Sequence, residues 1–117
     1  MDDKLYTYKA KCIRVVDGDT IDAEVDLGFK TFVRERFRLL GIDTPETYGV
    51  KKDSEEYKAG KLATDFVTEQ ILNKEIIIQT VKDKTGKYGR YLVTIFLEDG
   101  SNLNETLIKE GYAKEYI

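Results

Sequence analysis

The sequence predicts a mainly β fold of the α+β class, built as a five-stranded barrel with one helix between strands three and four and a short C-terminal helix. Three observations predict this fold. Apolar and polar residues alternate in several short runs, one longer stretch has helical spacing, and glycine-bearing turns separate these segments. The chain has 117 residues, which suits one domain, so we expect residues 1–117 to form a single domain.

The first three strands are predicted over residues 5–16, 20–27 and 29–40. In the first strand the apolar parity changes after Cys12, and such a shift is typical of a β-bulge. In the second strand, apolar residues alternate with acids. In the third, apolar residues alternate with a row of arginines, namely Arg34, Arg36 and Arg38. Antiparallel pairing of the second and third strands would place arginines beside acids.

The middle of the chain predicts an ordered loop followed by an amphipathic helix. Residues 41–53 lack periodicity and contain the only proline, Pro45. Ser54 fits the N-cap position, and apolar residues recur at helical spacing over residues 54–73. We expect this helix to cover one end of the sheet.

Two more strands and a short helix complete the pattern. Residues 75–81 and 91–97 are apolar, β-branched and aromatic runs on either side of a basic loop, 82–90. Asn102 stands three residues before Glu105, a spacing typical of a capping box, and opens the short C-terminal helix. The order of these elements is the one that a five-stranded Greek-key barrel of the OB type needs.

The composition limits the chemistry that these residues can perform. Histidine is absent and Cys12 is the only cysteine, which excludes histidine-based catalysis, the common zinc sites and an internal disulfide. We expect Cys12 to be a small buried core residue. The net charge of -3 argues against a protein that coats nucleic acid by bulk attraction, so any phosphate binding must be local. Carboxylates, arginines and tyrosines remain, and carboxylates suit a hard cation that prefers oxygen ligands.

The N-terminus lacks the basic start and apolar core of a signal peptide, and no stretch reaches membrane-spanning length. We therefore expect a cytoplasmic protein that has no membrane partner. We also expect it to be a monomer.

Three charged segments stand at strand ends or in glycine-bearing loops, where core packing does not explain them. They are Asp17-Gly18-Asp19-Thr20, the run from Arg38 to Glu46, and Lys87-Tyr88-Gly89-Arg90. Taken singly, each is ordinary turn chemistry. In this order and spacing, around a pattern of five strands, they closely resemble the staphylococcal nuclease (thermonuclease) family. The resemblance extends over residues 8–112.

The resemblance implies an OB barrel that hydrolyses DNA and RNA with calcium and with little sequence specificity. By position in the motifs, Asp19 and Asp43 match the calcium carboxylates of the family, and Thr44 matches the residue whose backbone carbonyl completes the protein ligands. Calcium takes roughly 6–8 oxygen ligands, so this set agrees with its preferences. Asp17 would lie just outside this shell.

The other matched positions bear on the substrate. Glu46 matches the carboxylate proposed as general base, which orients or deprotonates the attacking water. Arg38 and Arg90 match the two arginines that grip the phosphate, a task suited to a fixed guanidinium fork. Lys87 and Tyr88 match positions near the bound nucleotide.

A second hypothesis stays open: a catalytically silent OB module that binds single-stranded nucleic acid or a protein partner. The acidic balance favours the enzyme, because a pure binding module would more often be basic. Arg34 and Arg36 are expected to pair with acids on a neighbouring strand. Tyr112 and Tyr116 receive no role in nucleotide binding, because the likeness to the family is loose there.

Overall fold

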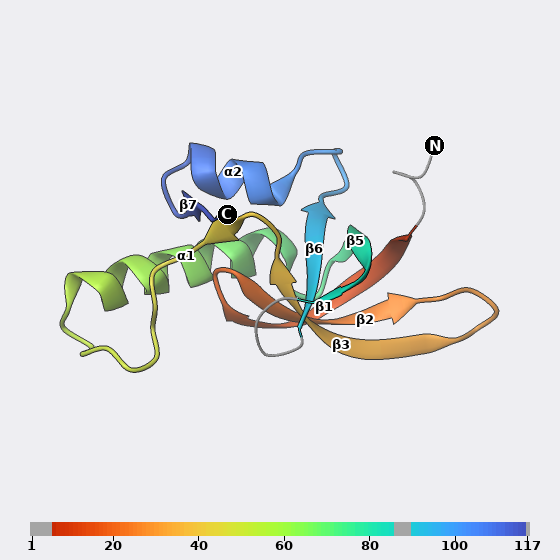
Figure 1. Cartoon of the computed structure of the whole chain (residues 1–117), viewed down its shortest axis with the longest axis horizontal. Coiled ribbons are helices and arrows are strands. Elements are labelled where there is room, and N and C mark those ends of the chain that lie inside the picture. Colours follow the sequence, from red (N-terminus) through yellow and green to blue (C-terminus); the bar gives the residue numbers. More distant parts are fainter. Residues whose placement is uncertain (1–5, 86–89, 117) are drawn as a thin grey trace.

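The computed structural model describes residues 6–85 and 90–116, which form a closed five-stranded barrel with two helices (Figure 1). In chain order the elements are β1 (Thr7–Asp17), β2 (Thr20–Asp26), β3 (Phe32–Leu39), β4 (Ile42–Asp43), α1 (Glu55–Ile71), β5 (Glu75–Thr85), β6 (Tyr91–Phe96), α2 (Leu103–Lys109) and β7 (Lys114–Glu115). This order confirms the predicted α+β class and the OB-type barrel. No helix within these described residues is long and apolar enough to cross a membrane.

The barrel strands follow the order β1-β2-β3-β6-β5, and β5 pairs back onto β1. All neighbours are antiparallel except β3 and β6, which pair in parallel through Phe37, Arg38 and Leu39. A parallel pair needs a long connection, and here that connection contains α1 and β5. The core fills the barrel and continues beneath both helices. Its fully buried members include Ile21, Leu39, Val67, Ile71, Ile78, Val93, Ile95, Leu103 and Leu107.

Local sequence signals set the starts of both helices as predicted, and α1 ends at Ile71 instead of residue 73. The Ser54 hydroxyl accepts a hydrogen bond from the backbone N–H of Tyr57 at 3.1 Å, and α1 begins at the next residue. The Asn102 side chain accepts from the N–H of Glu105 at 3.1 Å and caps α2. Each cap satisfies one of the N–H groups that a helix leaves without an internal partner.

The predictions for β1 and for the arginine row are also confirmed. The β1–β2 register shifts just after Cys12, whose side chain is fully buried. On the outer face of the sheet, Arg36 Nε lies 2.7 Å from an Asp22 carboxylate oxygen, and Arg34 Nε lies 3.1 Å from Glu24. These pairs are solvent-exposed and therefore contribute little stability, about 0–1 kcal/mol each.

The structure differs from the predictions at three further places. β3 begins at Phe32 instead of residue 29, because the hairpin turn includes Gly28, Phe29 and Lys30, all with positive φ. β5 runs on to residue 85. The loop after β3 is not wholly irregular, since the two-residue strands β4 and β7 pair there, and strands this short have no periodicity to detect.

Two glycines allow α1 to contact the segments that carry the charged motifs. A Cβ at Gly60 would lie only 2.5 Å from the Pro45 carbonyl oxygen, and one at Gly18 would lie 2.9 Å from Cγ2 of Thr44. Real Cβ atoms essentially never approach other atoms so closely. The turn after β1, the loop after β3 and α1 therefore pack together only because both residues lack a side chain.

The buried Asn104 attaches α2 to the barrel. Its Nδ2 donates to the carbonyl oxygens of Leu40 and Val93 at 2.9 and 3.0 Å, and its Oδ1 accepts from the N–H of Ile95 at 3.1 Å. One amide thus joins α2 to β6 and to the end of β3. This attachment places the chain after α2, which returns to β4 through β7.

We predict that Gly60→Ala destabilises the protein. Helix propensity alone would favour alanine by about 1 kcal/mol. The added methyl group meets the backbone of Pro45, however, so we expect the free energy of unfolding to fall by about 1–3 kcal/mol. Urea denaturation followed by circular dichroism measures it. Ala59→Gly, on the exposed side of the same helix, controls for propensity and should cost about 1 kcal/mol. A Gly60→Ala protein as stable as the wild type would contradict the packing described here.

Candidate active site

A pocket of about 390 Å³ lies where the β1–β2 turn, the end of β3 and the loop after it meet. Its lining residues are Asp17, Asp19, Thr20, Arg38, Asp43, Glu46, Arg90 and Tyr116. Five of the eight residues expected from the sequence thus share one pocket: Asp19, Arg38, Asp43, Glu46 and Arg90. The segments that supply them are far apart in the chain and are brought together by the closure of the barrel.

Asp19 lies at the centre of the contacts in this pocket. Its Oδ2 accepts a hydrogen bond from the backbone N–H of Thr44 at 3.1 Å and lies 3.4 Å from Nη1 of Arg38. Its Oδ1 accepts from the hydroxyl of Thr20 at 3.1 Å. The residue is only 8% exposed, and a buried carboxylate needs such partners to stay ionised. These bonds hold the turn after β1 against the loop after β3.

Arg38 connects the two carboxylates that were expected to bind metal. While Nη1 faces Asp19, Nη2 lies 3.1 Å from Oδ1 of Asp43. Nη1 also donates to the carbonyl oxygen of Ile42 at 3.3 Å. The guanidinium carbon lies 5.2 Å from the ring centroid of Tyr116, within the range of a cation–π contact. The guanidinium group is therefore fixed in position before any ligand binds.

Arg90 enters the pocket from the residue just before β6. Its Nη1 donates to the hydroxyl of Thr20 at 3.4 Å, so it approaches the same turn that carries Asp19. The parallel pairing of β6 with β3 makes Leu92 the partner of Arg38 and so brings Arg90 to this end of β3. Two guanidinium groups therefore line one pocket in a chain whose net charge is negative.

The crowded carboxyl groups shift each other's protonation. Burial raises the pKa of Asp17 to about 7, and a shared hydrogen bond with Asp19 adds to the rise. Burial alone would also raise the pKa of Asp19, but hydrogen bonds from Asp17 and from the Thr44 N–H, with the charge of Arg38, lower it overall. Desolvation raises the pKa of Glu46, and the charges of Asp19 and other nearby acids raise it further. The pocket thus favours an ionised Asp19 beside a carboxyl group that holds its proton more tightly.

The donor atoms in this pocket fit a hard cation. The carboxylates of Asp19 and Asp43 converge on one positive group, the guanidinium of Arg38, each through a different nitrogen. All the atoms in this pocket that could coordinate a metal ion are oxygens, which calcium prefers. Among the described residues, however, no three acidic, histidine or cysteine side chains are grouped as a metal site. A bound cation would therefore need backbone carbonyl, water or substrate oxygens besides the two carboxylates.

Thr44 is the one expected residue, among those that the structure describes, that does not line the pocket. Thr44 is buried, and its contact with the site is the N–H bond to Asp19. Lys87 and Tyr88 lie outside the described residues.

Tyr116 and Tyr112, to which the sequence analysis gave no role, lie in different places. Tyr116 lies over Arg38 because its N–H donates to the carbonyl oxygen of Gly41 at 2.9 Å, beside the β4–β7 pair, and no local pattern indicates this contact. Tyr112 does not line the pocket. It stacks on Phe66 with ring centroids 4.5 Å apart, beside the core.

Comparison with known proteins shows what this chain is similar to. A protein of Methanocaldococcus jannaschii described as uncharacterized is 36% identical over 129 residues, which cover 94% of this chain and 60% of the relative. The thermonuclease of Staphylococcus hyicus is 38% identical over 109 residues, covering 92% of this chain and 58% of the relative. Endonuclease YhcR of Bacillus subtilis is 34% identical over 114 residues, covering 94% of this chain and 9% of the relative. The chain therefore spans 60% or less of the length of these relatives.

The family model described as staphylococcal nuclease homologue matches residues 36–117, a range that includes Arg38, Asp43, Glu46 and Arg90. The match covers more than two thirds of the chain. The relatives extend the likeness to nearly all of it. The matched residues form part of the closed barrel and of the pocket. The chain belongs to the staphylococcal nuclease homologue family.

Proposed function

We propose that this chain is a calcium-dependent endonuclease that hydrolyses phosphodiester bonds in DNA and RNA with little sequence specificity. The observation that supports this most is a single pocket that contains two arginines, Arg38 and Arg90, and in which Arg38 contacts the carboxylates of both Asp19 and Asp43. Similar proteins carry the names thermonuclease and endonuclease. Two of the residues that line the pocket, Arg38 and Arg90, suit the recognition of phosphate, which carries no sequence information.

Arg38 and Arg90 bind the phosphate in this proposal. Negative charge on the phosphoryl oxygens increases as water attacks phosphorus, and a planar guanidinium placed in advance stabilises this charge without reorganising. The contacts of Arg38 with Asp19, Asp43 and Tyr116 keep the group in place. Arg90 is oriented by Thr20. Binding of substrate then replaces part of the carboxylate contacts of Arg38 by phosphate oxygens.

Glu46 directs the attacking water. It lies on the exposed side of the pocket, and its raised pKa makes it a better proton acceptor than an ordinary glutamate. Its backbone N–H donates to the carboxylate of Glu56 at 3.3 Å, which connects this loop to the first turn of α1. Together with the packing of Pro45 on Gly60, this contact fixes the residue in its loop.

Asp19, Asp43 and the backbone carbonyl of Thr44 would hold the calcium ion, which when bound supplies positive charge to the phosphate and acidifies a water molecule. Because burial raises the pKa of Asp17 to about 7, this carboxyl group is about half protonated at neutral pH, and the pocket carries less negative charge than its residue list suggests. This favours the approach of an anionic substrate.

Cleavage of fluorogenic single-stranded DNA and RNA by the purified protein tests the proposal. We expect turnover with calcium and none with chelator. Glu46→Gln keeps the shape of the side chain but removes the proton acceptor, so kcat should fall about 10²–10⁴-fold. Glu69→Gln, on the exposed face of α1, is the matched control and should cleave like the wild type. Binding of nucleic acid without cleavage by the wild type would instead favour the silent binding module.

We predict that Arg38→Ala and Arg90→Ala each lower kcat about 10²–10³-fold, because each removes a donor aimed at the charge that develops in the transition state. Arg34→Ala removes an exposed arginine from the same strand as Arg38 and should have little effect. Circular dichroism and thermal unfolding establish that the variants are folded. Turnover close to that of the wild type in both pocket variants would refute this assignment of the site.

A further inference from the structure

The β2–β3 hairpin projects beyond the barrel and carries exposed apolar side chains near its tip (Figure 1). β3 pairs with β2 over most of its length but with β6 only from Phe37 to Leu39, so the rest of the hairpin extends past the closed part of the barrel. Of the eight large hydrophobic side chains that are exposed among the described residues, four lie within residues 27–33. A contiguous apolar patch of this kind marks an interaction surface.

Phe29 stands at the tip of this hairpin in a backbone conformation that is uncommon for a bulky residue. Its φ is 55°, and Gly28 and Lys30 on either side also have positive φ. The turn is closed by two backbone hydrogen bonds of 2.9 Å, from Leu27 to Thr31 and from Thr31 to Gly28. The phenyl ring is fully exposed. The turn therefore presents an aromatic side chain to the outside of the molecule, in the way that strained residues often serve binding.

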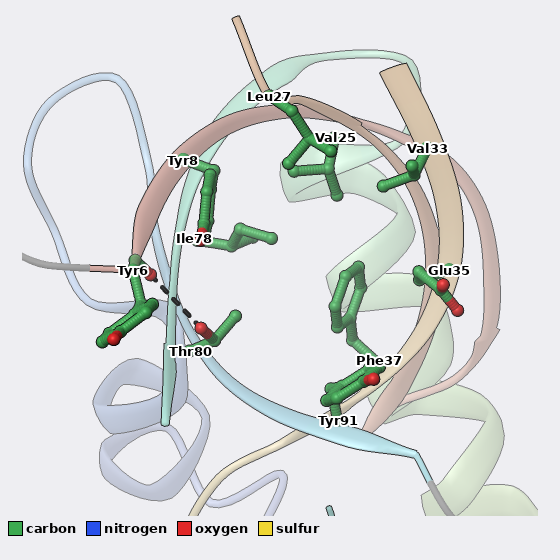
Figure 2. A pocket seen from close by; sticks show the side chains of 10 residues that line it. All are labelled: Tyr6, Tyr8, Val25, Leu27, Val33, Glu35, Phe37, Ile78, Thr80 and Tyr91. Carbon is green, nitrogen blue, oxygen red and sulfur yellow. Dashed lines mark hydrogen bonds between the residues drawn. The ribbon is translucent and has the colours of Figure 1, made fainter. Parts of the chain in front are cut away.

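The mouth of the barrel contains a pocket of about 330 Å³, the mouth pocket, with a mostly apolar and aromatic wall (Figure 2). Phe37 and Ile78 point into the opening. None of the residues that line the mouth pocket belongs to the pocket of Asp19 and Arg38. An apolar cavity of roughly 150 Å³ is enough for a benzene ring. The mouth pocket therefore has room for a phenyl side chain.

The tip and the mouth pocket carry opposite charges. Glu35 is the one charged side chain among the described residues that line the mouth pocket. It is exposed, and its partner on β2 is Ala23, which offers it no charge. Lys30 is the one charged residue within residues 27–33, and it follows Phe29 directly. The tip thus offers a ring and a cation, and the mouth pocket offers an apolar cavity and an anion.

The tip of a chain cannot fill its own mouth pocket, but the tip of a second copy can. Phe29 lies about 26 Å along the chain from Phe37, at roughly 3.3 Å per residue, and pairing with β2 keeps β3 straight. Two hairpins laid antiparallel about a twofold axis at Val33 bring Phe29 of each copy opposite Phe37 of the other. Lys30 then lies close to Glu35 of the other copy. Such a surface is self-complementary, as a twofold interface requires.

We propose that two copies of this chain associate through the inner faces of their β2–β3 hairpins, each inserting Phe29 into the mouth pocket of the other and placing Lys30 beside its Glu35. A buried aromatic side chain contributes roughly 150–250 Å², whereas stable interfaces bury about 1,200–2,000 Å² in total. Two rings and the apolar hairpin faces therefore form a weak dimer that depends on concentration. The sequence analysis expected a monomer, because alternation along β3 does not show that the barrel is open beside it.

Sedimentation velocity of the whole chain, from low micromolar to millimolar protein, measures the Kd of the dimer. The wild type should pass from monomer to dimer over this range. Loss of a buried aromatic anchor usually costs tenfold or more in affinity, and Phe29→Ser removes one from each copy, so its Kd should rise about 100-fold. Phe32→Ser is the matched control. Phe32 is 57% exposed on the same hairpin but lines a different pocket, with Lys9 and Lys11, and its loss should leave the Kd unchanged.

Charge reversal tests the register of the two hairpins. Lys30→Glu and Glu35→Lys each bring like charges together at both contacts, and each should raise the Kd at least about tenfold. The two changes in one chain restore opposite charges, so the double variant should dimerise like the wild type. Both residues are exposed, and circular dichroism establishes that the variants are folded.

A wild type that stays monomeric over the whole concentration range would overturn the proposal, and so would a dimer that tolerates Phe29→Ser. If Phe32→Ser weakens association as much as Phe29→Ser does, exposed apolar surface associates without using the mouth pocket, and the proposal fails. A double charge variant that dimerises no better than the single variants would overturn the antiparallel arrangement. No step of this test measures cleavage, so its result is independent of the proposed nuclease function.

Discussion

The buried carboxylate of Asp19 is the contact on which the rest of the site depends. It joins the turn after β1 to the loop after β3 through the Thr44 N–H, and it faces Arg38 across the pocket. A buried charge is costly unless it is paired, so Asp19 requires both partners. The two segments can approach only because Gly18 has no side chain to collide with Thr44. A feature of the backbone therefore determines where the carboxylates and the arginine meet.

β3 separates two chemical environments. Its outward residues are the arginines, and Arg38 at the end of the row lines the acidic pocket. Its inward residues are apolar except for Glu35, and they line the mouth of the barrel. This division explains how a chain with net charge -3 can still present a local site for phosphate. Two guanidinium groups and, in our proposal, one cation supply the positive charge there.

The parts of the fold that could be predicted are those written in short stretches of sequence. The alternation of apolar and polar residues predicted the barrel strands, and Ser54 and Asn102 predicted the helix starts. The arginine–acid pairs were predicted because arginines and acids occupy alternate positions of two neighbouring strands. What could not be predicted depends on contacts between distant segments or on backbone geometry. The β4–β7 pair and the position of Tyr116 depend on the direction in which the chain leaves α2. The β2–β3 hairpin turn has a positive φ at Phe29, a conformation that is uncommon for a bulky residue and that the sequence therefore does not predict.

Calcium binding measured with and without substrate tests the central claim most directly, because the claim is that one pocket holds the cation and the phosphate together. Calorimetric titration of the protein with calcium would be repeated with a saturating single-stranded phosphorothioate oligonucleotide that resists cleavage. We predict one calcium per chain, bound more tightly when the oligonucleotide is present, because phosphate oxygens complete the coordination. Equal calcium affinity in both titrations, or no calcium binding in either, would contradict the account.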